Sequence, residues 1–189
     1  MDNQQMINFT ASSSSSSMTS LKKYDAFLSF RGEDTRHNFT SHLHNALLQK
    51  QVDTYIDYRL QKGDEISGAL IKAIQDSLVS VVIFSQNYAS SKWCLDEITE
   101  ILECKRDHGQ IVIPVFYKVD PSHVRNQRGS YMDAFAKHEK DLNKANKLQK
   151  WKTALTEVAK LAGWHYPTTY RYTFLFINLC KWKLLLALA

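Results

Sequence analysis

Two side chains with chemical potential, Trp93 and Glu97, lie four residues apart in a segment of helical periodicity. Residues four apart share one face of a helix, whereas the aliphatic residues Leu95, Ile98 and Leu102 of the same segment occupy another. The aliphatic face must point at a core. The spacing therefore predicts that an indole ring and an acid are directed together at one ligand.

Basic residues that could bind phosphate occur in two other segments. Arg31 follows an apolar run directly, and its guanidinium can bind a phosphate through two hydrogen bonds. Gly32 would let a ligand approach the backbone, because it has no side chain. Arg59 and Lys62 add positive charge in a polar loop. Phosphate-binding groups, an aromatic ring and one acid fit a dinucleotide.

Each of these assignments has an ordinary alternative. A tryptophan at the start of a helix commonly fills a core, and most helical glutamates face water. Arg31 could pair with Glu33 or Asp34 instead of a ligand. By spacing alone, these alternatives stay open.

Short apolar runs alternate with helix-period segments along the chain. Strands are expected from β-branched and aromatic content at 24–30, 52–58, 80–85 and 111–119. Helices are expected around Phe39 to Leu47 with Asp34 or Thr35 as N-cap, after Gly63-Asp64, after Ser91, and at 148–161 with Gly163 as C-cap.

This alternation predicts an α/β domain with a parallel sheet between two layers of helices, of flavodoxin-like type. In such folds ligands bind beyond the carboxyl ends of the strands. The segments 31–34, 57–64 and 85–97 each follow a predicted strand. They should emerge on the same rim, which is where the candidate site is expected.

Composition bounds the domain organisation and the partners. A chain of 189 residues, 44% hydrophobic and 23% charged, suits one globular domain with tails. The net charge of +5 is concentrated beyond Phe135. The preceding body is not basic, so nucleic-acid binding is not expected as the main role. We divide the chain into a disordered Ser-rich leader (1–21), a folded domain (22–165) and an apolar tail (166–189).

The cysteines and the tail bear on location and metals. Three cysteines without a CxxC pair and no secretory signal favour a reducing, cytoplasmic setting, with the nucleus also open. His42 and His44 fall on different helix faces, so no metal site is expected. Lys181 and Lys183 interrupt the tail, which favours a peripheral or packed segment over a membrane anchor.

Five segments in order resemble the motifs of plant TIR domains, the Toll/interleukin-1 receptor-like module of disease-resistance proteins. They are YDAFLSFRGEDTRHNFTSHL, YIDYRLQKGDEIS, SQNYASSKWCLDEI, IVIPVFYKVDPSHVRNQRGSYMDAF and LQKWKTALTEVAKLAGW. Two positions depart from the family pattern, since Lys118 stands for an acid and Lys62 for an arginine. No P-loop of a nucleotide-binding module follows the domain.

The resemblance implies a five-stranded parallel sheet and an NAD glycohydrolase of defence signalling, with NAD or NADP as substrate and no cofactor. Glu97 would be the catalytic carboxylate. The implied nucleotide contacts are Phe30, Arg31, Gly32, Arg59, Lys62, Gly63 and Trp93. Ser41 and His42 match a Ser-His pair through which family members associate.

Two other functions share this fold. A TIR domain could act only as an adaptor that binds other TIR domains without hydrolysing NAD. A phosphoacceptor receiver domain needs an aspartate at the end of its third strand, and the run SVVIFSQ supplies none. The adaptor therefore remains the alternative to the NAD glycohydrolase.

Overall fold

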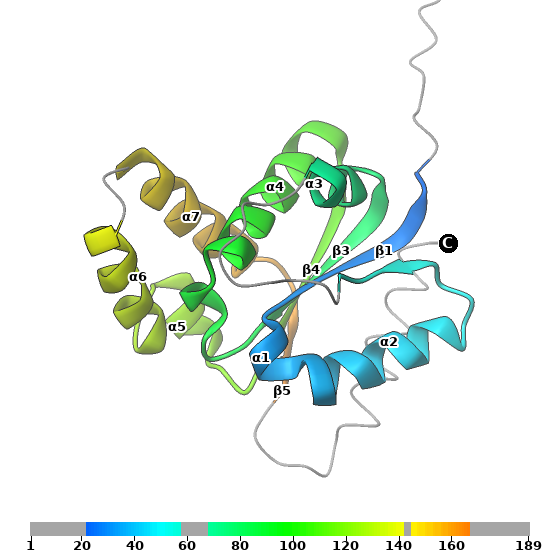
Figure 1. The fold of residues 1–189 in the computed structure, drawn as a ribbon, viewed down its shortest axis with the longest axis horizontal. Helices are drawn as coiled ribbons and strands as arrows, with labels where there is room; N and C mark the ends of the chain where they lie inside the picture. The colour runs from blue at the N-terminus through cyan, green and yellow to red at the C-terminus, as the bar shows by residue number, and fades with distance from the viewer. Residues whose placement is uncertain (1–21, 58–67, 142–144, 167–189) are drawn as a thin grey trace, which may run out of the picture.

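The computed structural model describes residues 22–57, 68–141 and 145–166. Its centre is a five-stranded sheet in the order β2-β1-β3-β4-β5, with every neighbouring pair parallel (Figure 1). The strands are β1 (Tyr24–Phe30), β2 (Thr54–Tyr55), β3 (Ser77–Phe84), β4 (Ile111–Tyr117) and β5 (Trp164–Tyr166). The three-layer α/β prediction is confirmed.

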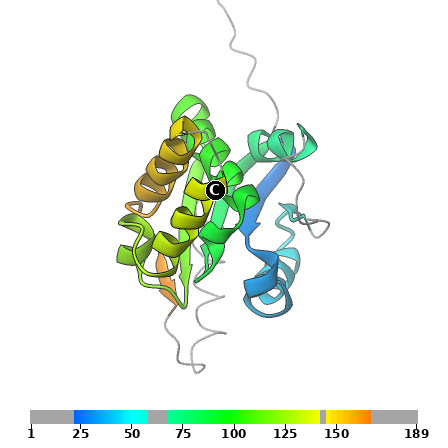
Figure 2. The same cartoon turned by 60° about the vertical axis from the view of Figure 1, so that its left-hand side comes forward.

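Helices cover both faces of the sheet (Figure 2). The chain passes from β1 through α1 (Gly32–Thr35) and the π-helical turn η1 (Arg36–Thr40) into α2 (Ser41–Leu48), which packs on one face. The opposite face is covered by α3 (Gly68–Gln75) and α4 (Lys92–His108), with α7 (Ala145–Val158) packed against α4. Within the described ranges, no helix is both long and apolar enough to span a bilayer.

The strands differ from the sequence prediction at their ends. β3 begins at Ser77, three residues before the predicted start, and this added polar residue is satisfied internally, because Ser77 Oγ donates to the Ala73 carbonyl at 2.7 Å. β4 stops at Tyr117 because Lys118 adopts a left-handed φ of 54°. Of the predicted strand 52–58, the described residues 52–57 form ladder pairs only at Thr54 and Tyr55.

The predicted helix after Ser91 is confirmed in detail. Ser91 Oγ accepts a hydrogen bond from the Cys94 backbone N–H at 3.3 Å, which makes it the N-cap of α4. Of the two predicted caps, Thr35 occupies the N-cap position of η1, although its side chain makes no capping hydrogen bond, and Asp34 lies inside α1. Helix α1 already begins at Gly32, with Arg31 as N-cap, and the Asp34 carboxylate is bonded elsewhere.

Four elements of the structure were not placed by the sequence analysis. They are the 3₁₀ turn η2 (Tyr88–Ser90), α5 (Pro121–Arg125), α6 (Ser130–Asp141) and β5. Asp120 caps α5, accepting from the Ser122 N–H at 2.7 Å, and Pro121 occupies its first turn. For α6 a signal was present, because Tyr131, Ala134, Phe135 and His138 recur at helical spacing and are buried.

Gly163 has a role other than the predicted C-cap. Helix α7 ends at Val158, and Gly163 does not adopt a left-handed φ. A Cβ on Gly163 would instead lie 2.4 Å from the Pro114 carbonyl oxygen, so the glycine lets the chain pass close to β4 as it enters β5.

Gly163→Ala is expected to destabilise the domain by about 1–3 kcal/mol, because the methyl group collides with rigid β4 backbone. Thermal unfolding measures this effect, as a fall in Tm of several degrees. Gly68→Ala is the matched control, since a Cβ there meets no atom within 4 Å. Equal Tm values for the two variants would contradict the close-approach role.

Candidate functional site

The direction of the strand connections changes between the carboxyl ends of β1 and β3. From β1 the chain turns to the face covered by α2, and from β3 it turns through η2 to α4 on the opposite face. Neighbouring strands whose connections leave to opposite sides form the switch point at which parallel α/β sheets bind ligands. The segments that begin with Arg31 and with Ser85 both start here.

Glu97 is buried at this point, with 2% of its surface exposed. It lies on α4 in the turn after Trp93, and its Oε2 accepts a hydrogen bond from Ser29 Oγ of β1 at 2.6 Å. The alternative that this helical glutamate faces water is therefore excluded. The acid is held against the carboxyl end of β1, an interior strand of the sheet.

Burial strongly perturbs the acidity of this group. Desolvation raises the pKa of Glu97 from its ordinary value of 4.5 to about 8, and the charges of Asp57 and Asp96 raise it further. When Glu97 is a carboxylate, a hydrogen bond donated by Ser29 and the nearby indole of Trp93 oppose this rise in pKa. A titratable group with so large a shift at a ligand-binding edge is a functional candidate.

Trp93 packs beside the core and also places its indole N–H near Glu97. Its ring is partly buried against the core cluster that includes Leu95 and Ile98, so it does fill space beside the core. Its indole N–H lies near enough to lower the pKa of Glu97, yet it meets no hydrogen-bond geometry although it is buried. A buried donor without an acceptor beside an acid is a place where a ligand oxygen could bind.

The guanidinium of Arg31 is held by its own neighbours. Arg31 Nη1 donates to Asp34 Oδ1 at 2.5 Å, and Nη2 pairs with Glu33. The pairing alternative from the sequence is thus realised with both acids. In this state the fork that could bind phosphate is already bonded to two carboxylates.

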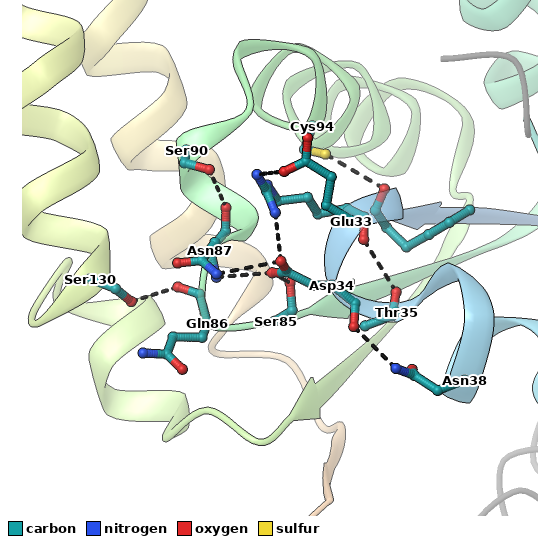
Figure 3. A network of polar contacts seen from close by, with 12 residues as sticks. Glu33, Asp34, Thr35, Asn38, Ser85, Gln86, Asn87, Ser90, Cys94 and Ser130 are labelled. Carbon is teal, nitrogen blue, oxygen red and sulfur yellow. Dashed lines mark hydrogen bonds and ion pairs between the residues drawn. The ribbon is translucent and has the colours of Figure 1, made fainter. Parts of the chain in front are cut away.

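Asp34 links the segment that follows β1 to the loop that follows β3 (Figure 3). Besides Arg31, its carboxylate accepts from Ser85 Oγ at 2.5 Å and from the Asn87 backbone N–H at 3.1 Å. Helix α6 joins from the other side, since Tyr131 Oη donates to the Ser85 carbonyl at 2.9 Å. The loop after β3 is therefore fixed by both α1 and α6.

Gly32 and Phe30 are placed differently from the simple expectation. A Cβ on Gly32 would lie 2.6 Å from Arg36 Nη2, so a guanidinium covers the backbone that a ligand was expected to approach. The Phe30 ring is buried in the cluster under α2, on the opposite face from Glu97. Only its carbonyl faces the site, accepting from Cys94 Sγ at 3.6 Å.

The remaining predicted residues belong to the loop after β2 and to α2. Arg59, Lys62 and Gly63 fall outside the described residues. Ser41 opens α2, with its Oγ donating to the Asn38 carbonyl at 2.9 Å, and His42 is exposed on the same helix. Their role in self-association stays a prediction.

The sequence analysis missed Ser29 and Tyr88, which line the buried side of Glu97. Ser29 Oγ lies 2.8 Å from Tyr88 Oη, and neither residue exposes any surface. A signal was present, because a serine interrupts the otherwise apolar end of the β1 run. A buried hydroxyl at the carboxyl end of a central parallel strand indicates a polar partner.

Comparison with known proteins agrees with this architecture. A model of the TIR domain family matches residues 23–177. The chain belongs to the TIR domain family. Disease resistance protein RPV1 of Vitis rotundifolia is 54% identical over 160 residues, which are 84% of this chain and 11% of that protein. TMV resistance protein N of Nicotiana glutinosa is 54% identical over 155 residues, covering 81% and 13%.

Solved TIR domains share the fold. The TIR domains of the activated Roq1 resistosome, which directly recognises the pathogen effector XopQ, match with a TM-score of 0.78 and 46% identity over 85% of this chain and 98% of that one. A chain of the RPS4 and RRS1 TIR heterodimer matches with a TM-score of 0.51 and 20% identity, covering 86% and 96%, which shows the fold alone. This chain spans about an eighth or less of the two resistance proteins above.

Glu97→Gln should make the TIR domain more stable than wild type as pH rises. The folded protein keeps the Glu97 proton up to about pH 8, whereas the unfolded chain releases it near 4.5. Wild-type stability therefore falls between these pH values, by up to about 1.4 kcal/mol per pH unit, and the neutral amide does not share this loss. Urea unfolding of both proteins from pH 5 to 9 measures the difference. A constant difference across the range would show that Glu97 titrates normally.

Asp34→Asn should destabilise the TIR domain by about 1–3 kcal/mol, because it leaves the partly buried Arg31 short of a charged partner and weakens the link to Ser85. Glu33→Gln is the matched control on the same arginine. Its carboxylate is half-exposed, so a change within about 0.5 kcal/mol is expected. If thermal unfolding gave equal losses, Asp34 would have no special role in joining the loops.

Proposed function

We propose that this TIR domain cleaves NAD, or NADP, at the bond between nicotinamide and ribose when several TIR domains assemble, as a step in plant defence signalling. The observation that carries the proposal is the buried Glu97 carboxyl, held beside Trp93 at the switch point of the sheet. A purely structural helix would not need an acid at a position that costs this much to ionise.

The chemistry explains why one acid is enough. Ordinary glycosidases use two carboxyl groups, because a poor leaving group must be protonated. Nicotinamide leaves the cationic ring of NAD as a neutral molecule, so no general acid is required. A single carboxylate near the ribose can bind its hydroxyls and stabilise the positive charge that develops in the transition state.

Binding of NAD would also favour the charged carboxylate form of Glu97. In the free domain the raised pKa of Glu97 favours the neutral carboxyl at pH 7. A cationic nicotinamide ring nearby favours the carboxylate, because opposite charges lower the pKa of an acid. The substrate would thus help to generate the anion that its own cleavage requires.

Assembly supports the proposal from two sides. The similar TIR domains of Roq1 are seen in an activated resistosome, and the predicted Ser41 and His42 surface of α2 is accessible in the single domain. Arg31 is bonded to Glu33 and Asp34 in this state. We infer that contact between TIR domains rearranges this edge to admit the nucleotide, in the cytoplasm.

A non-catalytic adaptor is the second candidate. The observation in its favour is that both amino groups of the Arg31 fork are already paired, so the single domain offers no free phosphate fork at this residue. In that case Glu97 would serve the fold only, and association through α2 would be the whole function.

NAD turnover by concentrated protein, followed by chromatography of nicotinamide release, separates the two candidates. Glu97→Gln is expected to reduce the rate at least 100-fold, because it removes the anion while keeping size and hydrogen bonding. Glu103→Gln is the control, an exposed acid on the same helix that should retain the wild-type rate. Full activity of the Glu97 variant, or no turnover by wild type in an assembled state, would favour the adaptor.

A further inference from the structure

A chain of buried polar groups runs from Glu97 into the interior. Ser29 Oγ lies 2.6 Å from Glu97 Oε2 and 2.8 Å from Tyr88 Oη, and Tyr88 Oη lies 3.1 Å from the Cys94 carbonyl oxygen. All four residues are at most 2% exposed. The three oxygen-to-oxygen contacts must therefore be satisfied by hydrogens that the residues themselves carry.

Counting those hydrogens distinguishes the two charge states of Glu97. The Cys94 carbonyl can only accept, and each hydroxyl has one hydrogen to donate. With a carboxylate, Ser29 donates to Glu97, and the single hydrogen of Tyr88 must serve either Ser29 or Cys94. One of three close contacts then has no hydrogen. With a protonated carboxyl, Glu97 donates to Ser29, Ser29 to Tyr88 and Tyr88 to Cys94, which satisfies all three.

We propose that Ser29 and Tyr88 are positioning residues that hold the Glu97 carboxyl in its protonated form, through a one-way chain of hydrogen bonds ending on the Cys94 carbonyl. Forming the carboxylate requires Ser29 to reverse its hydroxyl and donate back to Glu97. The chain thereby links the charge of the acid to the orientation of two buried hydroxyl groups.

Other ionisable and polar groups around Glu97 also act on its charge state. The ionisable and polar groups that act on Glu97, or on the thiol beside it, are Ser29 and Arg31 at the end of β1, Asp34 of α1, Asp57 after β2, Tyr88 of η2, Trp93, Cys94 and Asp96 of α4, and Tyr131 of α6. The Asp96 carboxylate is bonded to Lys147 and Trp151, and burial keeps the Cys94 thiol neutral by raising its pKa. Among the described residues, the hydroxyl groups that form a hydrogen-bonded chain to the Glu97 carboxyl are those of Ser29 and Tyr88.

This inference rests on the proposed function for its consequence, because a resting acid that is protonated cannot stabilise a cation. The free site would be held inactive at neutral pH, and either higher pH or a bound cationic ring would convert it. The hydrogen-bond chain itself can be tested without any turnover.

The test is a double-mutant cycle on the pKa of Glu97, measured in the full chain by NMR of ¹³C-labelled glutamate side chains, with Glu97→Gln assigning the signal. Tyr88→Phe removes the acceptor of the Ser29 hydrogen, so the neutral form loses one more hydrogen bond than the charged form. The pKa should fall by about 0.5–1 unit. In a Ser29→Ala background the same Tyr88→Phe change should have almost no effect, because the chain is already broken.

Tyr131→Phe is the matched control. It removes another fully buried hydroxyl that donates to a backbone carbonyl in the same region, the Ser85 carbonyl, without belonging to the chain. It should leave the Glu97 pKa unchanged. An unchanged or raised pKa in Tyr88→Phe, or an equal fall with and without Ser29, would overturn the proposal.

A second measurement keeps the proposal testable if a variant folds poorly. Infrared difference spectra between wild type and Glu97→Gln at pH 7 should contain the band of a protonated carboxyl group, and its absence would also overturn the proposal. If wild type never cleaves NAD but the pKa shifts follow the cycle, the proposed function fails and the hydrogen-bond chain stands. If turnover occurs and the cycle shows no coupling, the proposed function stands and the hydrogen-bond chain fails.

Discussion

Burying one carboxyl group at the edge of a parallel sheet is the constraint on which the rest of this site depends. A charged Glu97 without partners would cost several kcal/mol in such an environment, and the protein offsets this by hydroxyl groups and by favouring the neutral form. Ser29 can supply its hydroxyl only because β1 is central in the sheet and ends at this point. The topology and the acidity of the group are thus parts of one arrangement.

The remaining polar groups at the edge form a second, separate network. It centres on the Asp34 carboxylate, which accepts hydrogen bonds from Arg31, Ser85 and Asn87. The positive charge of Arg31 is therefore used internally in the single domain. Binding an anionic ligand would need an exchange of partners, in which phosphate oxygens replace carboxylate oxygens on the same guanidinium. An edge built from exchangeable ion pairs can hold its shape in the single domain and change partners in the proposed nucleotide complex.

Sequence reasoning recovered what depends on local pattern. The period of α4 placed Trp93 and Glu97 in adjacent turns, and Ser91 marked its start. What the pattern could not give was the environment of each side chain. Whether Glu97 faces water or the interior depends on which residue of β1 lies opposite, and that register is set by contacts far apart in sequence. Arg31 illustrates the same limit, because local spacing offered both a ligand and two acids as partners, and only the folded edge selects between them.

The π-helical turn at Arg36–Thr40 has a consequence for evolution of the surface. A π turn accommodates one residue more than an α turn, and one residue of an α-helix corresponds to about 100° of rotation. The extra residue therefore offsets the helical phase of α2 from that of α1. It lets Leu43 and Leu47 face the sheet while the segment before them keeps its place at the carboxyl edge. Losing that residue would turn the outward face of α2 by about a quarter of a circle. The geometry of any contact made by α2 is therefore fixed by η1, the short segment that leads away from the carboxyl edge of the sheet.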